Sequence, residues 1–500
     1  MNGMRRRLAA ISAAALLCAA LGGCGGGGGS SQPAGSVPPP SSDQPVPPPP
    51  PAPTVGISVA PTTVYQNQPA TLTWSSANAT SCVASGAWSG PQATSSSRTV
   101  NQAVAGTYTY TLACTGAGGT ATASTALTVS AAAANSVPVI VDGGVPGGPR
   151  TFNVPFVSVT VCAPGSSQCV TVGHVLVDTG SIGLRLLASA LGPSVTLPAV
   201  STSNGQAIAE CGQFADGFTW GSVRSADIRM AVEAALAMSL QVIGDTGAPY
   251  ATVPGDCSST GANHSTLAAL GANGILGVGL MIQDCGSYCA GFVLPGSYYA
   301  CTASGCTGST LATAKQVSNP VAFFAGDNNG VVLQLPQVGQ GGASNVAGTL
   351  VFGIGTQGNN AMGSVSVYAT DASGYITTTF NGSSMPASFI DSGSNGLYFA
   401  DPSLPSCKYS SGFYCPPSPV SLSADDRAAN GAAATVPFTV VAIDNLPASA
   451  TAGPVAGGAV SVSKGQSSFD WGLPFFFGRT VFVAIEAGST PGGAGPYWAF

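Results

Sequence analysis

Two short stretches of the chain, residues 175–184 and 388–397, match each other position by position. Each has apolar residues, an aspartate, a hydroxyl residue, Gly, Ser, one variable residue, Gly and Leu, and the aspartates are Asp178 and Asp391. Two such loops facing each other would place their carboxyl groups side by side. Because carboxylates about 3 Å apart cannot both ionise easily, the pair would share one proton. One carboxylate would then activate a water molecule while the protonated one polarises a carbonyl group.

The residues that follow each aspartate favour this arrangement. An apolar run that ends in Asp and continues with a hydroxyl residue, Gly and Ser predicts a strand that turns tightly. Gly180 and Gly393 permit close approach from the other copy of the motif. Four hydroxyl side chains can hydrogen-bond the carboxylates or the loop backbone and fix their orientation: Thr179, Ser181, Ser392 and Ser394. A single Asp-Thr-Gly or Asp-Ser-Gly is usually an ordinary turn, so the hypothesis depends on the duplication.

The composition argues against other common chemistries. Among 500 residues there are only two histidines, His174 and His264, and neither lies in a nucleophile-elbow or zinc motif. The chain has 13 Lys and Arg residues and a net charge of −6, with no basic cluster beyond its first few residues, so nucleic-acid binding is not expected. Water-mediated hydrolysis by two carboxyl groups needs no cofactor, and we expect no cofactor and no metal.

The duplicated motif resembles the pepsin-like aspartic peptidases, whose two lobes each supply an Asp-Thr/Ser-Gly-Ser/Thr loop. Residues 211–217 look like the flap hairpin of that family, which implies that Phe214, Asp216 and Gly217 lie over the substrate cleft. Three further segments resemble family strands in the same order along the chain: 273–279, 348–353 and 471–482. The chain also looks like an uncharacterised branch of bacterial lipoproteins with this architecture. The resemblance implies that Asp178 and Asp391 are the catalytic pair.

Three positions depart from the family pattern. Phe214 stands where the flap usually carries Tyr, so the apolar lid is kept and a hydroxyl is lost. Pro474 stands where the second threading segment usually has Gly, and a residue with fixed φ and no N–H would weaken the support of the Asp391 loop. Arg185 follows the first loop where animal pepsins have an aromatic residue. We expect it at the cleft, altering specificity or lowering the pKa of Asp178 if the two make contact.

The elements that must hold these loops are predicted to be strands. Charged residues make up 6% of the chain, far below about 25% in an ordinary soluble domain, while Gly (68) and Pro (38) are abundant. Residues 54–130 alternate apolar and Ser/Thr residues in short runs, which resembles an Ig-like β-sandwich. Within it, a disulfide between Cys82 and Cys114 is expected to join the two sheets near Trp74.

Residues 131–148, rich in Ala and Gly, are expected to be a linker, and residues 149–500 a pepsin-like domain. The whole chain is therefore predicted to be mostly β. An N-terminal Ig-like β-sandwich is followed by a bilobal pepsin-like β fold with an interlobe cleft. The expected N-lobe spans about 149–347 and the C-lobe about 348–500.

The first residues predict export. Three arginines at positions 5–7 precede an apolar stretch, 8–21, that is too short to span a bilayer, and small residues lead to Cys24. This pattern resembles a bacterial lipobox, which implies removal of residues 1–23 and a lipid on Cys24. Gly25 after it resembles sorting to the outer membrane of a Gram-negative bacterium. An ordinary signal peptide with an incidental Cys is the alternative. Residues 24–53, rich in Gly, Ser and Pro, predict a disordered tether.

The cysteines indicate an oxidising compartment. Of 14 cysteines, Cys18 lies in the signal peptide and Cys24 at the lipid site, which leaves an even set of twelve. Proximity in the sequence predicts six pairs: Cys82–Cys114, Cys162–Cys169, Cys211–Cys257, Cys285–Cys289, Cys301–Cys306 and Cys407–Cys415.

The sequence thus predicts an aspartic-type endopeptidase that is tethered by a lipid and cleaves peptides or proteins at the bacterial surface or in the periplasm. The alternative is a weakly active or inactive pepsin-like lipoprotein that binds peptide or glycan. The intact aspartate pair favours the peptidase, because a protein that only binds need not retain both carboxyl groups.

Overall fold

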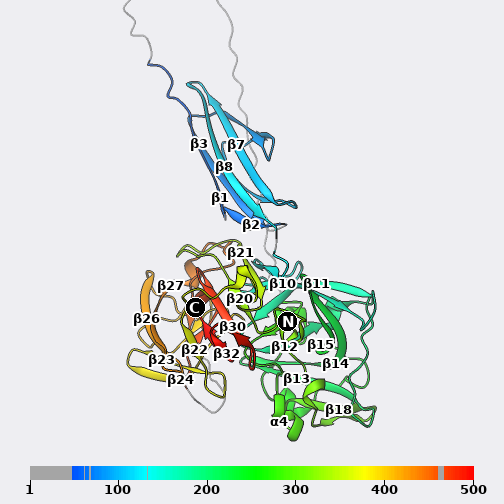
Figure 1. Ribbon diagram of the computed structural model, residues 1–500. Coiled ribbons are helices and arrows are strands. Elements are labelled where there is room, and N and C mark those ends of the chain that lie inside the picture. The colour runs from blue at the N-terminus through cyan, green and yellow to red at the C-terminus, as the bar shows by residue number, and fades with distance from the viewer. Residues whose placement is uncertain (1–47, 61, 67–68, 132, 460–466) are drawn as a thin grey trace, which may run out of the picture. The chain divides into compact units, whose positions relative to one another are not determined.

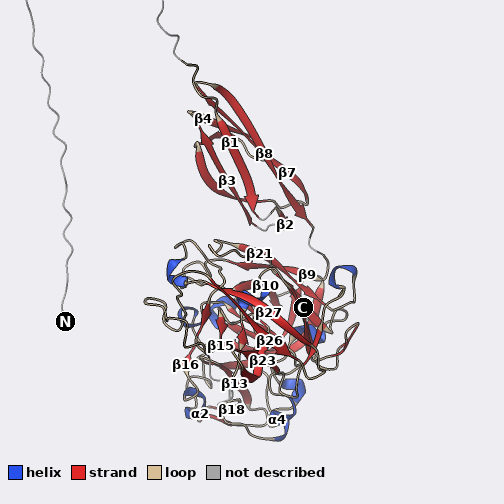
Figure 2. Cartoon of the chain, turned by 90° about the vertical axis from the view of Figure 1, so that its left-hand side faces the viewer, coloured by secondary structure: helices blue, strands red, loops and turns tan. Residues whose placement is uncertain are grey.

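The computed structural model describes residues 48–60, 62–66, 69–131, 133–459 and 467–500 (Figure 1). Strands are the main secondary structure of this part of the chain and helices are short (Figure 2), which confirms the prediction of a mostly β protein. The predicted signal peptide, Cys24 and most of the predicted tether lie outside the described residues. Within those residues, no helix is long and apolar enough to cross a bilayer.

Residues 54–130 form two antiparallel sheets, apart from one parallel pairing at an edge. The first contains β1 (Thr54–Ala60), β3 (Pro69–Ala77) and β6 (Ser95–Asn101). The second contains β2 (Thr63–Tyr65), β8 (Gly119–Ser130), β7 (Gly106–Gly116), β4 (Ser81–Gly86) and β5 (Gly90–Gln92), in that order. Buried side chains from both sheets form one apolar cluster that includes Leu72, Trp74, Tyr110 and Leu127. Residues 54–130 were predicted to form short antiparallel strands, and strands are the main element there.

The disulfide of this region lies within one sheet, contrary to the prediction that it would join the two. Cys82 on β4 is directly opposite Cys114 on β7, with Cα atoms 4.1 Å apart. Short cross-strand spacing of this kind occurs between facing residues of an antiparallel pair. The two sheets are instead held together by their shared apolar core, in which Trp74 packs edge-on against Trp88 at 5.1 Å.

The rest of the chain is built around one sheet of sixteen strands. In order these are β19 (Gly305–Gly308), β18 (Tyr298–Thr302), β13 (Ala207–Phe214), β14 (Gly217–Met230), β15 (Glu233–Ile243), β12 (Ile182–Leu187), β17 (Gly274–Val278), β11 (Cys169–Asp178), β10 (Pro155–Cys162), β9 (Ser136–Val141), β21 (Val346–Phe352), β20 (Gly330–Gln334), β30 (Thr480–Ala484), β33 (Tyr497–Ala499) and β22 (Val367–Ala369), with β16 (Ala262–Asn263) beside β14. A further pairing of β14 with β10 closes the strands between them into a barrel.

A second sheet of seven strands carries the other half of the site. Its order is β27 (Ala433–Val440), β26 (Val420–Arg427), β23 (Ile376–Phe380), β24 (Ser383–Ile390), β29 (Asp470–Trp471), β25 (Leu397–Tyr398) and β28 (Ala456–Gly457). A small hairpin, β31 (Ser489–Thr490) and β32 (Gly493–Ala494), completes the strands. The helices are α1 (Ala188–Leu191), α2 (Gly255–Ser258), α3 (Leu267–Leu270), α4 (Gly286–Gly291), η1 (Thr313–Lys315), η2 (Pro320–Phe323), η3 (Gly358–Asn360), η4 (Ile443–Asn445) and η6 (Leu473–Phe476).

The predicted linker, residues 131–148, contains the central strand β9, so the linker prediction is wrong for this stretch. β9 pairs with β10 on one side and with β21 on the other, and it thereby joins strands from the two halves of the sequence. Val139 and Val141 are fully buried in the main core. The run Ser-Val-Pro-Val-Ile-Val alternates as a strand should, but Ala- and Gly-rich flanks hide this signal in the sequence.

All six predicted disulfides are present with the predicted partners: Cys82–Cys114, Cys162–Cys169, Cys211–Cys257, Cys285–Cys289, Cys301–Cys306 and Cys407–Cys415. Five of them are in residues 131–500, where they close loops around the hairpin, the helices and the strand ends. Small loops closed in this way reduce the conformational freedom of the unfolded chain.

Candidate active site

The two aspartates occupy matching places in the two sheets. Asp178 is the last residue of β11, and Asp391 directly follows β24. Each of these strands has a parallel neighbour, β17 beside β11 and β29 beside β24, and the chain returns beside that neighbour as β12 or β25. The apolar runs before each Asp are buried strands, as their sequence predicts, and the tight turn follows where the apolar run ends.

The two loops are locked to each other by reciprocal hydrogen bonds. Thr179 Oγ1 donates to the carbonyl oxygen of Ile390 at 2.9 Å, and Ser392 Oγ donates to that of Val177 at 2.7 Å. In return, the backbone amide of Ser392 donates to Thr179 Oγ1 at 2.9 Å, and the amide of Thr179 donates to Ser392 Oγ at 3.1 Å. Both side chains are buried, so these bonds are shielded from water. This pair of hydroxyl residues fixes the distance between the loops.

The carboxyl group of Asp178 is held by its own loop. Oδ1 accepts the backbone N–H groups of Gly180 at 2.8 Å and Ser181 at 3.1 Å. Oδ2 accepts the hydroxyl of Ser181 at 2.5 Å. The Asp391 carboxyl repeats this pattern, with Oδ1 accepting the amide of Gly393 at 2.8 Å and Oδ2 lying 2.8 Å from Ser394 Oγ. The hydroxyl residues therefore do both tasks predicted for them.

Each carboxyl group lies over the glycine of the opposite loop. A Cβ atom added to Gly180 would lie 2.5 Å from Cγ of Asp391, and one added to Gly393 would lie 2.7 Å from Oδ1 of Asp178. No side chain fits at either position without displacing the opposite carboxyl group. The glycines of the motif thus leave the space in which the two acids meet.

The electrostatics of the pair make Asp391 the member that holds a proton. Burial is the largest factor that raises the pKa of Asp391 well above its ordinary range, followed by the charges of Asp178 and Asp470 and by a hydrogen bond with the Asp178 side chain. An acid with a raised pKa keeps its proton at higher pH. Because two adjacent carboxylates repel each other, the site favours the form in which Asp391 keeps its proton.

Pro474 does not weaken the Asp391 loop, contrary to the expectation from the sequence. It lies in the first turn of η6, where the missing N–H has no helical partner to lose. The loop is supported by its neighbours: Leu473 donates its amide to the carbonyl oxygen of Ser394 at 2.7 Å, and Gly472 packs directly on the loop backbone. On the first loop, Gly279 donates the matching bond to Ser181 at 2.9 Å. In the second loop the supporting hydrogen bond comes from Leu473, one residue earlier than the position that matches Gly279. The N–H that Pro474 lacks is therefore not needed to support the loop.

A cleft of about 490 Å³ opens above the two carboxyl groups. Residues from both halves of the sequence line it: Asp178, Thr179, Gly180, Ser181, Ile182, Gln213, Phe214, Ala215, Leu280, Met281, Ser373, Gly374, Tyr375, Phe389, Asp391 and Trp498. Phe214 lies at the end of β13, one residue before the tip of the β13–β14 hairpin, and is half-buried at the cleft. Phe214 therefore lines the cleft, and it presents an apolar ring there.

The other two predicted flap residues lie at the hairpin turn without lining the cleft. The side chain of Asp216 is 79% exposed and faces His264 at 3.4 Å. Gly217 is buried against the backbone of Ala262, where a side chain would clash. His264 thus stabilises the hairpin turn, and His174, in the middle of β11, pairs with Asp142 at 3.1 Å. The two histidines have structural contacts away from the aspartate pair.

Arg185 faces the flap strand and not Asp178. Its guanidinium group contacts Glu210 at 2.5 Å and Asp284 at 3.0 Å, and all three side chains are largely buried. Tyr298 donates its hydroxyl to Asp284 at 2.6 Å. Burial and the nearby Glu210 raise the pKa of Asp284 well above its ordinary range, so this acid keeps its proton to a higher pH than an ordinary aspartate. This cluster lines a smaller cavity of about 250 Å³ under Phe214, next to the cleft.

The residue that sequence reasoning missed is Asp470. It is 2% exposed and lies on β29, and its Oδ2 is 2.6 Å from Ser394 Oγ, the hydroxyl that also contacts Asp391. Burial raises the pKa of Asp470 to about 8; the hydrogen bond with Ser394 acts to lower it, and the charge of Asp178 acts to raise it. The signal was present in the sequence, since an acid stands between Phe469 and Trp471 in an otherwise apolar run.

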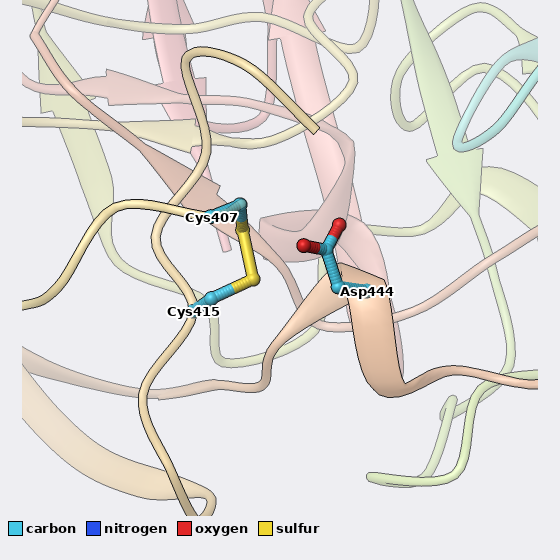
Figure 3. A group of neighbouring side chains, drawn as sticks. All are labelled: Cys407, Cys415 and Asp444. Atoms are coloured by element: carbon cyan, nitrogen blue, oxygen red, sulfur yellow. A yellow bond between two sulfur atoms is a disulfide. The ribbon is translucent and has the colours of Figure 1, made fainter. Parts of the chain in front are cut away.

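Among the described residues, one cluster away from the aspartate pair has side chains of the types that bind metals, namely Cys407, Cys415 and Asp444 (Figure 3). The two sulfur atoms are bonded to each other, so neither is a free thiolate. The Asp444 carboxylate accepts the amides of Lys408, Tyr409 and Ser410 at 3.0–3.1 Å. It therefore stabilises the loop between the cysteines.

We expect Gly472→Ala to destabilise the second loop. An added methyl group would overlap the carbonyl oxygens of Gly396 and Ser394, and overpacking of this kind costs about 1–3 kcal/mol. Gly458→Ala is the matched control, because its nearest atom would be 3.9 Å away, and it should change stability by less than about 0.5 kcal/mol. The measurement is urea unfolding. Equal effects of the two substitutions would contradict this account of the loop support.

Stability should fall as the pH rises from about 5 to 8. Burial raises the pKa of Asp426 to about 7 and that of Asp470 to about 8, and Asp391 is also raised. The unfolded chain releases these protons near pH 4, so between the two values the folded state binds more protons and loses stability with each step in pH. Urea unfolding at pH 5, 6, 7 and 8 measures this. A rise in stability across the same window would show that these acids are ionised in the folded protein.

Arg185→Met should destabilise the chain by about 3–5 kcal/mol, because removing one partner of a buried ion pair leaves the other without compensation. Arg229→Met is the control, since Arg229 is exposed on β14. Thermal unfolding of both variants measures the difference. A loss below about 1 kcal/mol for Arg185→Met would mean that the cluster does not stabilise the flap strand.

A family model described as Protein of unknown function (DUF3443) matches residues 131–500. No curated protein matches the chain. The matched segment begins directly after β8 and contains β9, both aspartate loops, the hairpin with Phe214, and Asp470. Because this match covers well over half of the sequence, the chain belongs to this family of proteins of unknown function.

Proposed function

We propose that the chain is an aspartic-type endopeptidase that hydrolyses peptide bonds with a water molecule activated by Asp178 and Asp391. The observation that carries this proposal is the placement of the two carboxyl groups, each over the glycine of the opposite loop, on loops joined by reciprocal hydrogen bonds. A purely structural role would not favour two buried acids in contact. Their proximity raises the pKa of Asp391, and burial of a charge is unfavourable. Shifted pKa values of this kind are typical of catalytic acids and bases.

The two acids take different parts in the proposed reaction. Asp391 holds the proton, so it donates a hydrogen bond to the carbonyl oxygen of the scissile peptide, and Asp178 accepts a proton from the attacking water. The hydroxide adds to the carbonyl carbon, and the proton of Asp391 moves to the oxygen. The tetrahedral intermediate then collapses as the proton on Asp178 passes to the leaving amine and one hydroxyl of the intermediate returns its proton to Asp391. Atoms and charge balance within the pair and one water molecule.

The cleft favours an apolar substrate. Among the described residues that line it, the two aspartates are the only Asp, Glu, Lys, Arg or His. The remaining lining is apolar or neutral and includes Leu280, Met281, Tyr375 and Phe389. A binding site of this kind excludes phosphorylated or strongly charged ligands and accepts an extended peptide with apolar side chains. Phe214 on the hairpin covers the cleft and excludes water.

The proposed place of action is the cell surface or the periplasm, with the lipid on Cys24 as the membrane anchor. Six disulfides support an oxidising compartment, since such bonds do not persist in a reducing cytosol. The lipobox-like Cys24 supports attachment to the outer membrane of a Gram-negative bacterium. Labelling with radioactive palmitate, compared between the native chain and Cys24→Ala, tests the anchor.

The peptidase proposal is tested with the full chain and a denatured protein substrate between pH 3 and 8, with and without a statine-type inhibitor. Asp178→Asn and Asp391→Asn should each lower kcat/KM by at least about 10²–10⁴-fold, because each removes one half of the acid–base pair. Asp425→Asn should keep full activity, since Asp425 is exposed on β26 and bonds only Thr435.

Cleavage should extend above the pH at which an ordinary aspartate has lost its proton, because the pKa of Asp391 is raised and the active pair needs one proton. Full activity of Asp178→Asn, or no inhibitor-sensitive cleavage at any pH, would contradict the proposal. Inhibitor binding without cleavage would identify a pepsin-like protein that only binds peptides.

A further inference from the structure

We propose that Asp470 is a positioning acid for the aspartate pair: its carboxyl group donates a hydrogen bond to Ser394 Oγ and thereby directs the Ser394 hydroxyl hydrogen onto Asp391. This inference rests on the proposed function and deepens it by adding a third acid that regulates the same site.

In the proposed reaction the proton of Asp391 points to the scissile carbonyl group, so the hydrogen bonds around Ser394 require a donor on Asp470. Ser394 Oγ lies 2.8 Å from Asp391 Oδ2 and 2.6 Å from Asp470 Oδ2. A hydroxyl group has one hydrogen, so it can donate to only one of the two acids. If it donates to Asp391, as Ser181 donates to Asp178, the contact with Asp470 is a hydrogen bond only when Asp470 is protonated. If Asp470 were ionised, the Ser394 hydroxyl would have to donate its hydrogen to Asp470 in this short contact. Asp391 would then lose the hydrogen bond from Ser394.

The first loop has no counterpart of this acid. Phe389 pairs with Asp470 in the parallel register of β24 and β29, and Leu176 pairs with Ile275 in the matching register of β11 and β17. The position of Asp470 is therefore occupied by an isoleucine behind Asp178. A loop of this shape therefore needs no acid at this place. The Asp391 loop has a buried acid behind it and the Asp178 loop does not. The two loops thus differ chemically, in accord with their different parts in the proposed reaction.

The surroundings of Asp470 favour its protonated form. It is 2% exposed, and its Oδ1 is buried with no hydrogen-bond partner among the described residues. The titratable groups around Asp470 are Asp391 on the loop after β24, Asp178 on the loop after β11 and Tyr398 on β25. Across the adjacent Trp471 lies Asp426 of β26, which accepts the indole N–H at 3.1 Å. In the described part of the chain, no Lys, Arg or His contacts Asp470, so nothing there compensates a negative charge.

A limit on activity follows at alkaline pH. Burial raises the pKa of Asp470 to about 8, so the neutral form dominates below this value. Above it, the new carboxylate takes the hydrogen of Ser394 and adds a second negative charge to a site whose active pair carries one. Asp391 loses a donor and gains a negative neighbour, which both raise its pKa, so its proton passes less readily to the scissile carbonyl oxygen. We therefore infer that ionisation of Asp470 switches the pair off.

The test compares the native full chain with Asp470→Asn, whose amide group keeps the shape, can donate to Ser394 and does not ionise. The first readout is calorimetric binding of a statine-type inhibitor, together with kcat/KM, from pH 5 to 9. The native chain should lose about tenfold in inhibitor affinity for each pH unit above about 8, and Asp470→Asn should be about tenfold less affected at pH 9. Asp425→Asn, an exposed acid on β26, should follow the native chain.

A second readout does not depend on activity. Urea unfolding should show Asp470→Asn gaining stability relative to the native chain as the pH rises from 5 to 9, because only the native chain must ionise a buried acid. At pH 6, where Asp470 is neutral, the effects of Asp470→Asn and Asp391→Asn on stability should be coupled, and the coupling should disappear when Ser394 is replaced by Ala.

The outcomes separate the two proposals. If the gain in stability does not change with pH, or the coupling survives Ser394→Ala, the role assigned to Asp470 is wrong, whether or not the chain cleaves peptides. If both stability results hold but the alkaline limit of inhibitor binding is the same in the native chain and Asp470→Asn, the acid does not control the pair. If the native chain neither cleaves nor binds the inhibitor, the peptidase proposal fails, and the stability cycle still decides the hydrogen-bond assignment.

Discussion

The reciprocal bonds between Thr179 and Ser392 are the interaction on which the site depends. Each hydroxyl donates to the backbone of the opposite strand and accepts from the opposite loop, and both are buried. They hold together two loops that come from different sheets, so the separation of the carboxyl groups is set by four hydrogen bonds. Because these bonds are out of contact with water, losing one would leave a buried polar group without a partner. The fold therefore fixes the pair more firmly than the carboxyl groups could by themselves.

The rest of the site follows from this constraint. Once the loops are held at this distance, a side chain larger than hydrogen at position 180 or 393 would collide with the opposite acid, which explains the glycines. The repulsion between the acids, combined with burial, raises the pKa of Asp391 and leaves one proton on the pair. Behind the second loop, Asp470 adds another acid that is stable in this place only while it is neutral. Proton occupancy of the whole site is thus determined by packing.

The sequence predicted the features that depend on local pattern. The duplicated Asp-hydroxyl-Gly-Ser turns, the mostly β composition and the six disulfide pairs were all visible in the order and spacing of the residues. The pairing partners of a strand are set by the whole fold, and predictions that needed them were wrong. β9 lies in a stretch that its Ala- and Gly-rich flanks mark as a linker, and the Cys82–Cys114 bridge lies within one sheet. Pro474 was expected to weaken the second loop. The expectation was wrong because the supporting hydrogen bond comes from Leu473 and not from residue 474. Asp470 was missed because its partner Ser394 is distant in the sequence.

Carboxyl titration by carbon-13 NMR, with labelled aspartate, tests most directly whether Asp178 and Asp391 share a proton. The account predicts two linked titration steps that both resonances follow, with the upper step well above roughly 3.9, the ordinary value for an aspartate. Asp178→Asn should abolish the linkage and leave Asp391 with a single step. Two independent titrations near the ordinary value, unchanged when either partner is replaced, would contradict the shared proton and with it the proposed mechanism.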